Sequence, residues 1–79
     1  MTSAAEHYLR DLGDLIKERA REAKIAKDAA MGTERFDFEL GRLTALHEVV
    51  SLMQQQAEAF GFDLSAVALN DVSPERDLT

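Results

Sequence analysis

The amino-acid sequence predicts an all-α fold, a two-helix antiparallel hairpin followed by a short C-terminal helical segment. Three observations lead to this fold class. The only proline is Pro74, so nothing in the preceding chain interrupts a helix. Apolar residues recur at spacings of three and four along two long segments, which is the period of a helix packed on one side. Gly32 lies between these segments, and glycine commonly ends a helix.

The first helix is predicted from about residue 3 to about residue 31. Its apolar seam consists of Leu9, Leu12, Ile16, Ala23, Ala26 and Ala30, and Tyr8, Leu15 and Ala20 widen it. The first half of the seam is bulky, whereas the second half is almost all alanine, whose small side chain lets a neighbouring backbone approach closely. The two halves should therefore pack at different distances. Gly13 lies inside this helix, where we interpret it as a tolerated residue or a bend.

The second helix is predicted from about residue 36 to about residue 60 and carries two apolar stripes. One stripe is Phe36, Leu43, Leu46, Val50, Met53, Ala57 and Phe60, and the other is Phe38, Ala45, Val49, Leu52 and Ala59. At about 100° per residue the two stripes adjoin and cover well over half of the helix circumference. A helix that rests on one neighbour needs a stripe of only about 100° or slightly more. The first stripe therefore predicts contact with the first helix, and the second predicts contact with another copy of the chain.

This surplus of apolar surface predicts a homodimeric four-helix bundle. The predicted dimer interface is Phe38, Ala45, Val49, Leu52, Gln56 and Ala59. A chain of 79 residues is near the lower size limit for a stable single core, so such chains often depend on disulfides, a metal or self-association. The absence of cysteine excludes disulfides and thiolate zinc sites, which leaves self-association.

The remaining residues predict a short closing segment and a tail. Gly61 should end the second helix, and residues 63–69 should form one or two helical turns that fold over the open end of the bundle. Ser73 and Pro74 have the form of a helix start, but few residues follow them, so residues 73–79 are predicted to be a flexible tail. The single domain is accordingly predicted to span residues 1–72.

Four basic residues of the first helix form a line on the side opposite its apolar seam. They are Arg10, Lys17, Arg21 and Lys24. One interpretation is a solvated face with weak helix-stabilising ion pairs, such as Lys24 with Asp28. The other is a partner-binding surface for phosphates or for an acidic protein. No exposed aromatic residue lies among them to stack on bases, which disfavours nucleic acid as the partner.

Candidate catalytic residues are few. His47 lies at the edge of the second helix's first stripe, where it is either a half-buried packing residue or a pH-sensitive interface residue. Ser51 is the only nucleophile near it, and a Ser/His pair without an orienting acid or an oxyanion site is not a catalytic arrangement. Phosphate-loop, dinucleotide, zinc and calcium-loop spacings are absent. We therefore expect no catalytic residues, no metal site and no cofactor.

The formal net charge of −6 opposes broad adhesion to nucleic acid or anionic membranes, and no apolar run is long enough to span a bilayer. The chain does not begin like a secretory signal, so a cytoplasmic location is expected. The first hypothesis for function is a small non-enzymatic homodimer that acts as a protein–protein interaction or regulatory module. The alternative is a small RNA- or DNA-associated regulator that uses the basic line, and steep salt dependence of binding would distinguish it.

Overall fold

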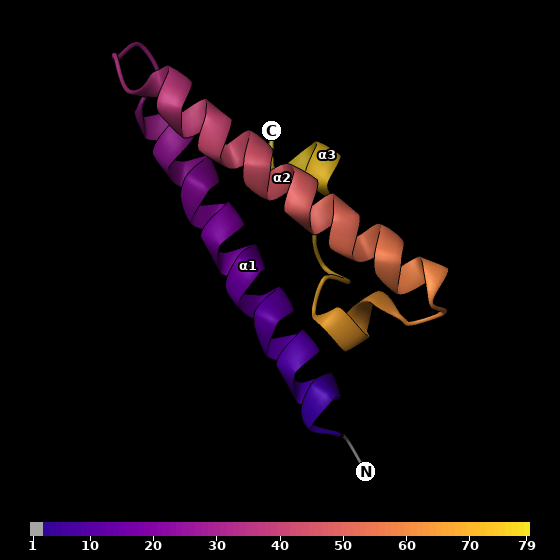
Figure 1. Cartoon of the computed structure of the whole chain (residues 1–79). Helices are drawn as coiled ribbons and strands as arrows, with labels where there is room; N and C mark the ends of the chain where they lie inside the picture. Colours follow the sequence, from indigo (N-terminus) through magenta and orange to yellow (C-terminus); the bar gives the residue numbers. More distant parts are fainter. Residues whose placement is uncertain (1–2) are drawn as a thin grey trace.

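The computed structural model describes residues 3–79 of the chain. Its elements are α1 (Ala4–Ala29), α2 (Phe36–Ala59), the 3₁₀ helix η1 (Leu64–Val67) and α3 (Pro74–Asp77). α1 and α2 form the hairpin, and the chain then returns along it through η1 and α3 (Figure 1). The predicted all-α hairpin is therefore confirmed. Residues 1 and 2 of the predicted domain lie outside the described part.

The ends of α1 follow the residues that the sequence offers for capping. The hydroxyl oxygen of Ser3 accepts a hydrogen bond from the main-chain N–H of Glu6 at 3.1 Å. This bond satisfies one of the N–H groups that the first turn leaves free. The helix ends at Ala29, slightly before the predicted residue 31, and Gly32 then adopts a positive φ of 79°. Because glycine has no Cβ to clash in this left-handed conformation, it provides the turn that the sequence predicted.

α2 also ends with a glycine in the left-handed conformation. Gly61 has a φ of 74°, and the main-chain N–H of Phe62 donates to the carbonyl oxygen of Ala57 at 2.8 Å. A bond that reaches back across the last turn in this way satisfies a carbonyl group that the helix would otherwise leave free. The chain therefore reverses directly after Ala59 and enters η1.

α1 and α2 lie close together near the turn and diverge toward their other ends, where η1 occupies the opening (Figure 1). In its half nearer the turn, α1 buries only the small side chains of Ala20 and Ala23, and Ala30, directly after the helix, is buried as well. Toward the open end the larger Leu9 and Ile16 pack at the edge of the core. The predicted difference in packing distance is confirmed, since the two backbones approach most closely where the side chains are smallest.

The core continues from the hairpin into residues 62–79, which we call the tail. Leu43 and Val50 of α2 are almost completely buried, and so are Leu69 and Leu78 of the tail. The tail thus supplies large side chains to the same cluster as the two long helices. It is a structural part of the domain, packed along one side of the hairpin.

Residues 73–79, for which the sequence predicts a flexible tail, contain a short helix and a buried leucine. Pro74–Asp77 forms α3, and Leu78 after it is only 1% exposed. The helix begins at Ser73 and Pro74 as their pattern indicated, and the carboxylate of Asp77 accepts a hydrogen bond from the main-chain N–H of Ser73 at 2.9 Å. Burial of Leu78 against the hairpin holds the segment in place, a long-range contact that the short local pattern did not reveal. The predicted helical turns at 63–69 are present in shorter form as η1.

Gly13 allows η1 to lie directly on α1. A methyl group added at Gly13 would overlap the carbonyl group of Val67, the last residue of η1. Gly13 is accordingly buried in the middle of a helix. It is neither merely tolerated nor shown to bend the helix, because its lack of a side chain is what makes room for the tail.

Replacing Gly13 with alanine should lower the free energy of unfolding by about 1–3 kcal/mol, because the tail backbone must move away from α1. Gly41→Ala is the matched control. Gly41 is also inside a helix, but a methyl group there meets nothing within 4 Å, so this change should raise the stability by up to about 1 kcal/mol. Urea unfolding followed by circular dichroism measures both, and equal stabilities for the two variants would contradict the proposed close approach.

Candidate functional site

Lysine side chains of α1 bind the tail. The Nζ of Lys17 donates to the carbonyl oxygen of Ala68 at 2.8 Å and lies 2.9 Å from a carboxylate oxygen of Asp71. Its side chain is only 12% exposed, so the tail covers most of it. The Nζ of Lys24 donates to the main-chain oxygen of Thr79 at 2.6 Å. Both contacts join residues more than fifty positions apart in the sequence.

The basic line predicted as a partner-binding surface is therefore largely engaged within the chain. Lys17 and Lys24 contact the tail directly, and a guanidinium nitrogen of Arg21 lies 3.6 Å from Asp71. Lys24 also pairs with Asp28 at 3.3 Å, as the helical spacing predicted. Arg10, the fourth residue of the line, is exposed. The side of α1 that the sequence suggested was free is the side on which the tail packs.

Side chains of α2 hold the tail from the other side. The amide nitrogen of Gln54 donates to the carbonyl oxygens of Leu69 at 3.1 Å and of Val72 at 2.9 Å. Gln54 is partly buried on α2, where a polar group needs hydrogen-bonding partners, and its partners are carbonyl groups of the same chain. Because the tail segment between η1 and α3 has no regular structure of its own, Gln54 satisfies carbonyl groups that would otherwise lie unpaired near the core.

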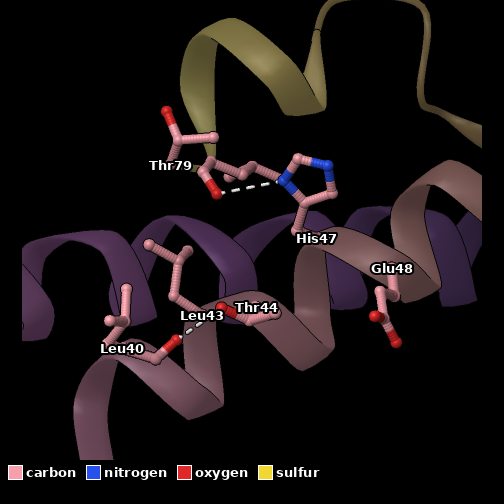
Figure 2. Close-up of a pocket in the computed structure, with 7 residues that line it drawn as sticks. Leu40, Leu43, Thr44, His47, Glu48 and Thr79 are labelled. Carbon is pink, nitrogen blue, oxygen red and sulfur yellow. Dashed lines mark hydrogen bonds between the residues drawn. The ribbon is translucent and has the colours of Figure 1, made fainter. Parts of the chain in front are cut away.

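His47 lies in a pocket between α2 and the end of the tail. Its Nδ1 is 3.2 Å from the carbonyl oxygen of Leu78, a distance at which the ring donates a hydrogen bond when Nδ1 carries the proton (Figure 2). The pocket has a volume of about 430 Å³, and Leu40, Leu43, Thr44, Glu48, Leu78 and Thr79 line it with His47. The half-buried packing position predicted for His47 is confirmed.

The chemistry available in this pocket is limited. The hydroxyl of Thr44 donates to the carbonyl oxygen of Leu40 at 2.8 Å, and His47 faces a main-chain carbonyl group (Figure 2). Neither group is therefore arranged as a nucleophile next to a base. Among residues 3–79, no three histidine or acidic side chains gather in a way that could hold a metal ion. Within that same range, no helix has the combined length and hydropathy needed to cross a membrane.

The two predicted stripes of α2 differ in burial, although Phe60, the last member of the first stripe, is 72% exposed. Leu43, Val50 and Ala57 of the first stripe are buried against the rest of the chain. The second, which with Gln56 we call the α2 stripe, consists of Phe38, Ala45, Val49, Leu52, Gln56 and Ala59, and all six are exposed. The exposed fractions of its three largest side chains are 67% for Phe38, 39% for Val49 and 57% for Leu52.

α1 adds exposed apolar side chains to the same face of the hairpin. Tyr8 is 65% exposed and Leu15 is 56% exposed. Leu15 lies two residues, or about 200° of helix rotation, from Gly13, which touches the tail. Leu52 is likewise two residues from Gln54, which binds the tail. Leu15 and Leu52 therefore both point away from the tail, and sequence reasoning recognised only the α2 part of this face.

Glu39 is a buried acidic residue that sequence reasoning did not single out. It is 6% exposed, and its two carboxylate oxygens lie 3.3 Å from a guanidinium nitrogen of Arg35 and 3.5 Å from one of Arg42. Its place in the spacing of the first stripe could have indicated its burial. Paired with two arginines, its charge is compensated close to the hairpin turn.

Removal of the Gln54 amide should weaken the attachment of the tail. Gln54→Leu leaves the carbonyl groups of Leu69 and Val72 without their donor, and an unsatisfied buried polar group costs about 1–3 kcal/mol. Gln55→Leu is the matched control, since Gln55 is the exposed neighbour and its loss should change stability by less than about 0.5 kcal/mol. Denaturant unfolding of both variants checks this difference, and equal effects would show that the two carbonyl bonds contribute nothing.

The contact between Lys17 and Asp71 should make stability depend on pH. The hydrogen bond from Lys17 lowers the pKa of the Asp71 carboxyl below its ordinary value of 3.8. A carboxyl group whose pKa is lower in the folded state stabilises the fold above its unfolded pKa, and this contribution is lost as the pH falls through the folded pKa. Asp71→Asn should therefore reduce stability at pH 7 by a small amount, because the Asp71 side chain is 53% exposed and water screens the ion pair.

The difference between the unmodified chain and Asp71→Asn should disappear as the pH is lowered from about 4 toward 2. Urea unfolding at a series of pH values measures it, and taking the difference between the two proteins removes the titration of the other carboxyl groups. A difference that stays constant down to pH 2 would exclude the ion pair as its cause.

Comparison with known proteins gives no assignment. No protein-family model matches the chain, and no match is found among curated proteins or solved structures. The two sides of the hairpin differ, because the tail occupies one and the other is exposed.

Proposed function

We propose that this protein is a small non-enzymatic helical module that forms a homodimer through the α2 stripe and acts by binding other proteins. The observation that carries the proposal is the exposure of Phe38, Val49 and Leu52 along one face of α2. Large apolar side chains gathered on one face of a folded protein are typical of an interaction surface, because leaving them in water is unfavourable.

The position of the tail supports this use of the stripe. The tail lies against Gly13 on α1 and Gln54 on α2, on the side of the hairpin away from Leu15 and Leu52. The described chain has thus already completed the core on one side with its own residues. The stripe on the other side is left for a second molecule, and joining two such faces produces a four-helix bundle.

A protein-binding role is preferred to nucleic-acid binding for an electrostatic reason. Binding of phosphates requires lysine and arginine side chains that are free to approach them. Lys17 and Lys24 instead bind oxygen atoms of the tail, and Arg21 lies beside Asp71. Because a phosphate would have to displace these contacts, we do not adopt the alternative of an RNA- or DNA-associated regulator.

A surface outside the stripe is available for other proteins. Ile25 is 69% exposed on α1, away from both the tail and the stripe. It is flanked by the exposed Glu18 and Glu22. A homodimer would carry this apolar residue with its charged surroundings, Glu18, Glu22 and Arg21, twice, so Ile25 is the contact we propose for a further partner.

Leu52→Glu should convert the dimer into folded monomer at micromolar concentration. A carboxylate in the centre of an apolar interface would lose its hydration, whereas in the monomer the same side chain is exposed and leaves the core intact. Val49→Glu should act in the same direction. Sedimentation equilibrium measures the mass, and circular dichroism checks that the helices remain.

Ile25→Glu is the matched control, because Ile25 is also an exposed apolar residue but lies outside the stripe. It should leave the mass of the dimer unchanged. A monomeric unmodified chain at tens of micromolar would contradict the proposed dimer, and so would an equal loss of dimer in the Ile25 and Leu52 variants.

A further inference from the structure

We propose that two copies associate with their α2 helices antiparallel, so that Phe38 of each copy enters an apolar notch at the far end of the other copy's stripe. This inference rests on the proposed homodimer and specifies its geometry. Two structural features carry it: an exposed aromatic side chain at one end of α2, and an apolar hollow at the other.

The notch lies at the open end of the hairpin. It has a volume of about 150 Å³, and its lining comprises Leu9, Met53, Gln56, Ala57, Phe60, Phe62 and Val67. The lining is apolar apart from Gln56, which also belongs to the α2 stripe. The notch is therefore continuous with the stripe and can receive an apolar side chain that approaches along this face.

Phe38 is the apolar side chain best placed to fill it. It is 67% exposed in the first turn of α2, whereas the notch borders the last turns of the same helix. Since α2 rises about 1.5 Å per residue, Phe38 and the notch are about 30 Å apart and cannot meet within one chain. Only a second copy, turned end for end, brings the Phe38 of each molecule to the notch of the other.

The same rotation matches the rest of the stripe by size. Pairing Phe38 with Ala59 of the other copy places the midpoint next to Val49. About this midpoint Leu52 faces Ala45, so the two largest side chains, Phe38 and Leu52, each meet an alanine, and Val49 lies next to Val49 of the other copy. Facing large residues with small ones is how packed helices interdigitate without voids or overlap.

The polar residues of the face also agree with this midpoint. Arg42, which flanks the stripe, would lie near Gln56 of the other copy, so that the polar side chains adjoin one another. Glu48, the charged residue next to the midpoint, is exposed at the flank of the stripe, at the rim of the His47 pocket. An interface with these properties is isologous, because the same surface is used by both copies and is complementary to itself.

A parallel arrangement would lose these matches. Phe38 would then face Phe38 and Leu52 would face Leu52, while Ala45 and Ala59 would face only alanine. The notch of each copy would also be left unfilled. The size pattern of the stripe thus selects the antiparallel arrangement of α2 among pairings of this helix with itself.

Single cysteines can test the arrangement, because the chain contains none of its own. Val49→Cys lies beside the two-fold axis, where the two sulfurs come within disulfide reach, so mild oxidation should give a covalent dimer in high yield. Phe38→Cys alone and Ala59→Cys alone should not crosslink, because in the antiparallel dimer each of these residues lies about 30 Å from the same residue of the other copy. An equimolar mixture of the Phe38 and Ala59 variants should give a mixed covalent dimer.

Gln55→Cys is the control, since Gln55 is exposed on α2 but lies off the stripe. Covalent dimer in the Phe38→Cys sample alone would overturn the antiparallel arrangement, as would a yield for Val49→Cys no higher than that of the control. Sedimentation of the unmodified chain separates the two proposals. If it is a dimer but crosslinks in the wrong pattern, only this geometry fails, whereas a monomer removes the proposed dimer as well.

Discussion

The close approach of the Val67 carbonyl group to Gly13 is the constraint on which the rest of the structure depends. It lets η1 lie in the opening between α1 and α2 instead of beside them (Figure 1). From there the following residues reach Lys17 and Gln54, and Leu69 is buried in the core that the tail shares with the two long helices. A side chain at position 13 would displace the tail backbone and thereby weaken each of these contacts.

Much of the hairpin was predictable because its causes are local. Ser3 caps the start of α1, and Gly32 and Gly61 form the turns after α1 and α2, all through contacts within a few residues. The small alanines toward the end of α1 predict close packing of the two helices. The turns at residues 63–69 were predictable from their apolar side chains, but the packing of the last residues was not, because Leu78 stands among polar residues and is buried only by contacts with distant parts of the chain. The apolar surface of α2, wider than one neighbouring helix can cover, did predict an exposed stripe. The contribution of α1 to that face was not recognised.

The basic residues of α1 illustrate why charge patterns alone do not locate a binding surface. The line of positive side chains is real, but part of it provides donors for main-chain oxygens of a tail that lacks regular structure over much of its length. A polypeptide without helices or strands keeps unpaired carbonyl groups, and long flexible lysine side chains can satisfy them. In a small domain with little apolar surface to bury, such bonds help to attach a segment that hydrophobic contacts alone would hold weakly.

The two long helices meet at small alanine side chains near the turn, so side-chain volume there contributes to the angle at which they diverge toward the open end. The size of the side chains at those contacts therefore affects the distance between α1 and α2 at the open end, several helical turns away. One added methylene beside Ala23 would swing the N-terminal half of α1 relative to α2 and change the shape of the hollow between them. A single substitution within the core can in this way change the shape of the exposed surface without replacing any residue on that surface.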